Sequence, residues 1–291
     1  MRLGVIFPQL EIGSDPGAIR AYAQAVEEMG FDHLAIFDHV LGADPTNRPG
    51  WTRYTHRSMF HEPMVLFGYL AAVTQRLELA TSILILPQRQ TVLVAKQAAE
   101  VDVLTDGRLR LGVALGWNEV EYEALNEDFH TRGRRLAEQI EVLRLLWTQP
   151  VVTYHGKWHH ITEAGLNPPP VQRPIPVWVG GSAEPALKRI AKVADGWFPN
   201  GPPDEQRRAM VEAFRGYVKD AGRTMADIGV EARISVATGS TTDWRSGAEG
   251  WRALGATHLS LTTEGGGFAS LDDHIEALQQ GKQAITDVIR A

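Results

Sequence analysis

The sequence predicts an α/β protein, a (β/α)8 or TIM barrel with an insertion between its fourth and fifth strands. Eight short apolar runs recur along the chain, and a helical pattern follows each of them. Eight such units over 291 residues fit a barrel better than a doubly wound sheet of six strands.

The first two strands indicate the direction of the sheet. Residues 3–7 and 33–37 are apolar runs typical of buried strands. Between them, Asp15 and Pro16 begin a helical pattern that Gly30 ends. A strand, a helix and a second strand in direct succession favour parallel pairing.

Residues 41–61 form the longest stretch without hydrophobic periodicity. A loop of this length is usually functional or disordered, and its aromatic side chains argue against disorder. We therefore expect a lid or a wall of the substrate pocket here, with four candidate pocket residues: Trp51, Tyr54, His56 and His61.

The remaining elements continue the alternation. Further strands are expected at 77–86, 109–114, 177–179, 196–198, 229–237 and 258–261. Helices are expected at 62–75, 91–104, 118–146 with a break near 131–133, 184–194, 204–221, 247–254 and 271–289. A predicted hairpin at 151–161 and a cluster of prolines interrupt this order, so residues 149–175 are the expected insertion in a single domain of residues 1–291.

Composition argues against several classes of protein. The formal charge of −6 and the lack of a basic stripe argue against a nucleic-acid surface, and the absence of cysteine excludes disulfides and thiolate metal sites. No apolar run approaches the ~20 residues of a membrane span, and no signal peptide is evident, so we expect a cytoplasmic protein. His155, His159 and His160 have no carboxylate at ligand spacing, so we expect surface histidines and no metal site.

In a barrel of this kind the chemistry belongs to residues just after the strand ends. The segment 104–119 is the clearest case: a strand-like run is followed by Gly116 and by Asn118, a candidate N-cap. This order lets backbone N–H groups meet an anion, although every βα unit has such a turn. Other positions after strands include Gln9, Asp38, His39, 84–87, 180–182, 199–200, 238–240 and 262–267.

Four segments, together with IFDHV near the start, cover most of the chain and carry a resemblance. They read TSILILPQRQ, AKQAAEVDVLTDGRLRLGVALGWNEVEYEAL, FHTRGRRLAEQIEVLRLLW and PIPVWVGGSAEPALKRIAKVADGWFP. In this combination the chain resembles the luciferase-like monooxygenase superfamily. Its strand GVALGW resembles the branch that uses the deazaflavin coenzyme F420, because the FMN branch tends to carry an Asn-Val-Val-Thr-type strand there.

The resemblance implies roles at two strand ends. His39 corresponds to the histidine that the family places near the reactive face of the ring, where an imidazole suits proton donation. Asp38 would orient a neighbour or meet the ring edge. A cis peptide bond is implied between Ser82 and Ile83, in a bulge behind the ring. Without the resemblance, His39 would be a loop histidine bonded to backbone, and residues 82–83 an ordinary strand.

The resemblance also implies a cofactor-binding wall. Gly180 and Gly181 would admit a close backbone approach, and their N–H groups with the Ser182 hydroxyl would hold the cofactor's phosphate. The alternative for these two glycines is an ordinary tight turn of the barrel. The opposing wall would come from Trp117, Asn118 and Glu119, and Gly116 beside them is also expected to bind the cofactor. The alternative for residues 117–119 is the capping of the helix that follows them.

One function and two alternatives follow. The expected function is that of an oxidoreductase, a homodimer, that transfers a hydride between F420 and a small organic substrate. The alternatives are an FMN-dependent monooxygenase and a non-catalytic flavin-binding barrel. Trp117 occupies the position of a catalytic glutamate in the sugar-phosphate dehydrogenase branch. Since an indole cannot transfer that proton, sugar-phosphate oxidation is not expected.

Overall fold

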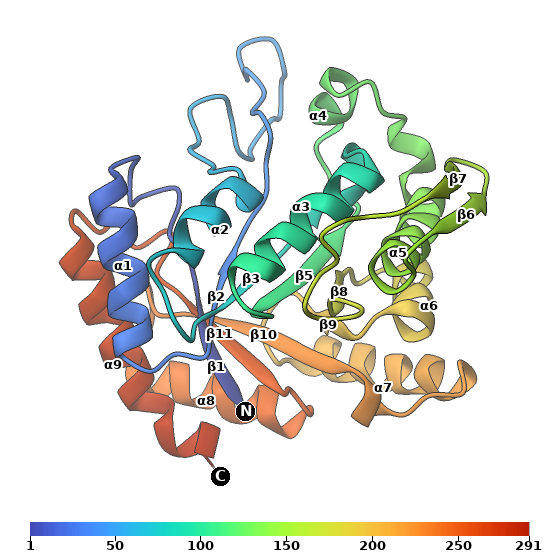
Figure 1. The fold of residues 1–291 in the computed structure, drawn as a ribbon. Coiled ribbons are helices and arrows are strands. Elements are labelled where there is room, and N and C mark those ends of the chain that lie inside the picture. The colour runs from blue at the N-terminus through green and yellow to red at the C-terminus, as the bar shows by residue number, and fades with distance from the viewer. Residues whose placement is uncertain (291) are drawn as a thin grey trace.

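The barrel closes through β3 (Glu78–Thr81), which pairs with β2 (His33–Ile36) on one side and with β5 (Leu109–Ala114) on the other. The computed structural model describes residues 1–290. All pairs of ring strands are parallel, which confirms the predicted TIM barrel (Figure 1). The other ring strands are β1 (Arg2–Ile6), β8 (Val177–Gly180), β9 (Gly196–Phe198), β10 (Gly229–Ser235) and β11 (His258–Thr262).

Helices cover the outside of the ring (Figure 1). In chain order they are α1 (Pro16–Glu28), α2 (Pro63–Ala71), α3 (Thr91–Leu104), the short α4 (Glu119–Ala124), α5 (Arg132–Thr148), α6 (Glu184–Val193), α7 (Glu205–Asp220), α8 (Thr241–Ala253) and α9 (Leu271–Arg290). Among residues 1–290, no helix combines the length and the apolar character that crossing a bilayer requires.

The helix starts follow capping rules. Side chains of Asp15 and Glu62 accept hydrogen bonds from the first turns of α1 and α2, each of which begins with proline. The prediction of a helix from 247 was six residues late, because Ser240 and Asp243 form a capping box that starts α8 at Thr241. The helix predicted over 118–146 is broken, but the break begins earlier than the predicted 131–133: α4 ends at Ala124, a turn of 3-10 helix covers Phe129–Thr131, and α5 begins at Arg132.

The third strand is split rather than continuous over 77–86. β3 ends at Thr81, and the two-residue β4 (Leu84–Ile85) continues beside β5. Between them, the peptide bond from Ser82 to Ile83 is cis, as the resemblance implied.

The insertion forms a hairpin outside the ring, between the fourth and fifth ring strands. Its strands are β6 (Val152–His155) and β7 (His160–Ala164), which pair antiparallel. His159 in the turn bonds Glu138 of α5 at 2.9 Å and Thr91 of α3 at 2.6 Å. The prediction of a surface histidine was therefore wrong at this position, because the chain brings a carboxylate to it from another element.

Charged side chains fill the ring near the amino ends of its strands. Arg110 pairs with Glu78 at 2.7 Å and with Glu231, and His33 lies 3.1 Å from Glu231. Burial alone would raise the pKa of Glu231, but Arg110 and His33 hold it well below its usual range. The indole of Trp178 covers the Arg110 guanidinium at 4.3 Å. Because these groups fill the lower ring, space for a ligand remains at the opposite end.

Candidate active site

Two adjoining cavities lie at the carboxyl ends of the strands, with volumes of about 440 and 240 Å³. In Figure 1 this is the upper end, where α4 and the long segment between β2 and α2 rise, away from the chain termini. The two cavities share Ser82, Ile83, Gly116, Trp117 and Arg233. The larger cavity is also lined by Gly180, Gly181 and Ser182. The smaller, called here the His39 chamber, is completed by Phe37, Asp38, His39, Tyr54 and Ile85.

His39 is held by a carboxylate from α4. Its Nδ1 lies 3.1 Å from both carboxylate oxygens of Glu121. Three aromatic rings surround the imidazole, with centroids 4.8 to 5.6 Å away: Tyr54, Phe60 and Trp117. With Nδ1 bound to a carboxylate, Nε2 is the ring nitrogen left to exchange a proton with a ligand in the chamber.

Glu121 is ionised in this arrangement. Its side chain is fully buried, and burial alone would raise the pKa of its carboxyl group. Hydrogen bonds from His39, from Gln88 at 3.3 Å and from the N–H of Val40 at 2.7 Å outweigh burial and lower the pKa below its ordinary value. An ionised Glu121 accepts a hydrogen bond, so Nδ1 of His39 carries the hydrogen.

Asp38 lies beside His39, but its carboxylate is bound by protein groups. Oδ2 accepts from the N–H of Ile85 at 2.9 Å, and Oδ1 accepts from Arg89 at 2.7 Å. Burial raises the pKa of Asp38, although the Arg89 guanidinium opposes this shift. Since both oxygens are occupied, Asp38 fixes β4 against the end of β2.

Glycine backbone forms much of the wall next to Ile83 and Ile85. A Cβ at Gly116 would lie 2.7 Å from Cγ2 of Ile85, and a Cβ at Gly180 would lie 3.3 Å from Cγ2 of Ile83. Beyond Ser182, the N-cap Ala183 makes no side-chain hydrogen bond to the first turn of α6. Pro185 in this turn has no N–H, and the N–H of Ala186 already donates to the carbonyl of Ala183 at 2.8 Å, so the N–H of Glu184 is the group of the first turn that is left for an anion.

The loop of residues 41–61 brings only part of its predicted set to the site. The ring of Trp51 lies 5.5 Å from that of Trp117, and its Nε1 donates to the carbonyl of Tyr54. His56 is exposed, and His61 bonds the carbonyl of Gly13 at 3.3 Å. These two histidines and Trp51 lie outside the lining of both cavities, so Tyr54 is the predicted pocket residue that lines one of them.

Asn118 is buried and acts locally. Its Oδ1 accepts from the N–H of Val120, which caps α4, and its Nδ2 donates to the carbonyl of Leu41 at 3.4 Å. It therefore ties the long loop to the helix that carries Glu121.

Several residues at the site were given no role by the sequence reasoning, among them Phe60, Glu121 and Arg233. Two of these had a signal that could have indicated them. Glu121 lies in the first turn of the helix that follows a strand end, and Arg233 alternates with Glu231 along one strand.

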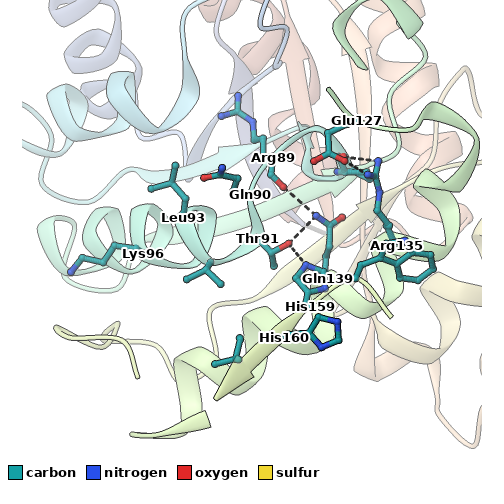
Figure 2. A pocket seen from close by; sticks show the side chains of 14 residues that line it. Arg89, Gln90, Thr91, Leu93, Lys96, Glu127, Arg135, Gln139, His159 and His160 are labelled. Atoms are coloured by element: carbon teal, nitrogen blue, oxygen red, sulfur yellow. Dashed lines mark hydrogen bonds and ion pairs between the residues drawn. The ribbon is translucent and has the colours of Figure 1, made fainter. Parts of the chain in front are cut away.

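A larger cavity, of about 680 Å³, lies outside the ring between α3, α5 and β7 (Figure 2). Its polar side chains mostly bind one another: Gln139 donates to Thr91 at 3.0 Å, and Arg135 pairs with Glu127. These bonds, with that between His159 and Thr91, fasten the hairpin to two helices. Pro87 is the one position predicted from the strand ends that lines this cavity, and no residue assigned to catalysis, cofactor or substrate does, so it is not the candidate active site.

The sequence model of the luciferase-like monooxygenase family matches residues 1–262. The chain belongs to this family. Its members are oxidoreductases, including monooxygenases, and this protein is therefore an enzyme of that broad class.

The similar proteins whose descriptions name a cofactor differ in which one they use. An uncharacterized protein of Mycobacterium tuberculosis is 34% identical over 209 residues, which are 69% of this chain and 72% of that one. An FMNH2-dependent dimethylsulfone monooxygenase of Pseudomonas putida is 32% identical over 220 residues, 74% of this chain and 57% of that one. A solved structure of an F420-dependent secondary alcohol dehydrogenase, in complex with an F420-acetone adduct, has a TM-score of 0.80 at 16% identity, over 98% of both chains.

Proposed function

We propose that this protein transfers a hydride between coenzyme F420 and a small organic substrate. The observation that carries the proposal is the position of His39. Glu121 holds its Nδ1, and its ring lines the same chamber as Ile83 and Trp117. Hydride transfer to a carbonyl or an activated double bond requires a proton donor beside the hydride carrier, and the reverse reaction requires a proton acceptor.

The larger cavity is suited to the coenzyme. Its volume of about 440 Å³ falls within the range of small-molecule sites. The backbone of Gly116 and Gly180 offers a wall without side chains, against which a flat ring system can pack. We assign Ser82, Ile83, Gly116 and Trp117 to binding of the coenzyme's deazaflavin ring system. We assign Gly180, Gly181 and Ser182, which precede α6, to binding of the coenzyme's phosphate.

The chain contributes binding, orientation and a proton. When bound, the coenzyme supplies a ring carbon that gives or accepts a hydride. His39 holds or releases a proton at Nε2, and Glu121 keeps the imidazole in one orientation and stabilises it when it is charged. Tyr54 and Trp117 line the chamber, and Trp51 packs against Trp117 from outside it. Asp38 and Asn118 act indirectly, by fixing β4 and the long loop.

FMN-dependent monooxygenation is the second candidate. The Pseudomonas putida relative that uses FMNH2 favours it, although this chain spans only 57% of that protein. The alcohol dehydrogenase that uses F420 has the same fold over 98% of both chains, but a monooxygenase structure matches as completely, so the fold is compatible with both candidates. A barrel that binds flavin without catalysis is the third, and the buried pair of His39 and Glu121 argues against it.

Fluorescence-quench titrations with F420 and with FMN test the proposal. We expect the purified protein to bind F420 at micromolar concentrations or tighter, and FMN at least tenfold more weakly. Tight binding of FMN alone would reject the F420 proposal and make oxygen uptake with reduced FMN the next assay. Binding of neither would reject both cofactor assignments.

A homodimer and a cytoplasmic location remain proposals. Apolar side chains at the start of α2 and α3 support the dimer, because Val65, Val92 and Leu93 are 72, 48 and 52% exposed. Light scattering of the purified protein measures the mass directly, and a monomer would contradict the dimer.

A further inference from the structure

Arg233 projects into the interior of the ring at the level of the active site. Alternate residues of a strand share a face, so Glu231, Arg233 and Ser235 of β10 point the same way. Glu231 lies inside the ring, bound to Arg110 and His33. The Arg233 side chain therefore also points inward, where it lines both the larger cavity and the His39 chamber and remains exposed to solvent.

The Arg233 guanidinium lacks the carboxylate partners that other cations at the barrel have. Arg110 is paired with two glutamates, and Arg89 is paired with Asp38 and Glu62. Within residues 1–290, Arg233 makes one hydrogen bond, from Nη2 to Asn200 at 3.3 Å, and lies over the Phe37 ring at 5.0 Å. Four of the five guanidinium N–H donors remain free for a ligand.

The groups that face Arg233 do not neutralise it. Glu231, one layer lower on the same strand, is already bound to Arg110, His33 and Ser260. Glu264, from the end of β11, acts on Arg233 from beyond ion-pair distance. Burial raises the pKa of Glu264 to about 7, so this carboxyl group is only partly ionised at neutral pH. Tyr54 is the remaining titratable neighbour.

We propose that Arg233 binds a carboxylate group of the substrate, and that the substrate is therefore a small organic acid anion. The inference rests on the proposed function, because it places this anion beside the coenzyme. A guanidinium matches a planar carboxylate with two parallel hydrogen bonds. The chamber of about 240 Å³ equals the liquid volume of roughly eight water molecules, which limits the substrate to a small one. An anion held at Arg233 would place its remaining atoms toward His39 and Ile83.

Binding to the coenzyme-free protein tests this assignment without knowledge of the natural substrate. Benzoate and crotonate serve as probes, and benzamide and crotonamide are their neutral counterparts of equal heavy-atom count. At constant ionic strength, calorimetry is expected to show that each acid binds about tenfold or more tightly than its amide. Equal affinities for acids and amides would overturn the proposal.

Substitutions test whether Arg233 is the residue that gives the preference for the acids over the amides. Arg233→Gln is expected to remove the preference for the acids, whereas Arg215→Gln, on the exposed face of α7, is expected to keep it. A preference that persists in Arg233→Gln would overturn the assignment. If that variant does not fold, Arg233→Lys replaces it. The preference for the acids over the amides should then fall about threefold or more, because lysine keeps the positive charge but cannot make the two parallel hydrogen bonds of a guanidinium. An unchanged preference would overturn the proposal.

A titration with F420 separates the substrate from the coenzyme. Arg233→Gln is expected to bind F420 within threefold of the wild type. A tenfold weakening would overturn the proposal, because Arg233 would then belong to the coenzyme. A wild-type protein that prefers the acids but binds no F420 would reject the proposed function and leave the carboxylate site standing. A protein that binds F420 without preferring the acids would reject the carboxylate site alone.

Discussion

Nδ1 of His39 lies 3.1 Å from both carboxylate oxygens of Glu121, a residue 82 positions further along the chain. The two side chains follow β2 and β5, ring strands that have β3 between them. The side chain of His39 is 9% exposed, and that of Glu121 is fully buried. A buried carboxylate that fixes an imidazole and leaves its second nitrogen toward a cavity is a common arrangement for moving protons.

Glu121→Gln is therefore expected to slow the reaction without weakening substrate binding. An amide stabilises a charged imidazole less than a carboxylate does, so kcat should fall by about tenfold to hundredfold with little change in KM. Steady-state kinetics measure both values. Glu123→Gln, two residues later on α4 and exposed, is the matched control and should leave kcat unchanged. A wild-type kcat in Glu121→Gln would contradict the role of the pair.

His39→Asn distinguishes catalysis from mere binding. If Nε2 moves the proton, activity should fall by roughly 10² to 10⁴, the contribution typical of a general acid or base. Binding of F420, measured by fluorescence quenching, should stay within threefold. His155→Asn, on the exposed hairpin, is expected to behave as the wild type. If His39→Asn kept full activity, His39 would not be the proton donor; if the wild type bound the cofactor but showed no turnover, the non-catalytic barrel would be favoured.

Most of the fold could be predicted because local chemistry specifies it. The strand Leu109–Ala114 and the helix Thr91–Leu104 were predicted to the residue, since the polar turn of residues 105–108 marks the end of the helix and the start of the strand. α8 was predicted late because its first turns are polar, and because Gly247 and Gly250 weaken its helical signal. Its capping box, Ser240 with Asp243, was the signal to follow.

Contacts across the barrel could not be predicted in the same way. Positions such as His39 and Gly180 were found because they follow strands, where a barrel places its chemistry. The partners of His39 and His159, which are Glu121 and Glu138, depend on how the ring and its helices close. Sequence spacing carries no signal for such pairs.

Stability should depend on pH through Glu264. Burial raises the pKa of Glu264 from 4.5 to about 7. Between these values the folded protein keeps a proton that the unfolded chain has lost, so stability is full below pH 4.5 and falls as the pH rises through about 7. Glu264→Gln mimics the protonated group. It should match the wild type at pH 4 and exceed its unfolding free energy by roughly 2 kcal/mol at pH 8, after allowance for partial exposure.

Urea unfolding at the two pH values measures this difference. Glu123→Gln, at an exposed position of α4, is the control and should show no such dependence on pH. A gain in Glu264→Gln that is equal at pH 4 and pH 8 would show that burial of this carboxyl group is not the cause.

Gly116→Ala should damage the cofactor wall. Gly116 has a φ of +69°, and a Cβ there would lie 2.7 Å from Ile85 Cγ2. The added methyl group strains the backbone by about 1 kcal/mol and also displaces Ile85. Because Gly116 lines both cavities, F420 should bind at least tenfold more weakly, as fluorescence quenching would measure.

Gly13→Ala separates backbone strain from damage to the wall. Gly13 has a φ of +77°, and no atom lies within 4 Å of the position that a Cβ would take there. This variant should lose similar stability in urea unfolding and bind F420 as the wild type does. Equal F420 affinities in Gly13→Ala and Gly116→Ala would show that the backbone at Gly116 does not face the coenzyme.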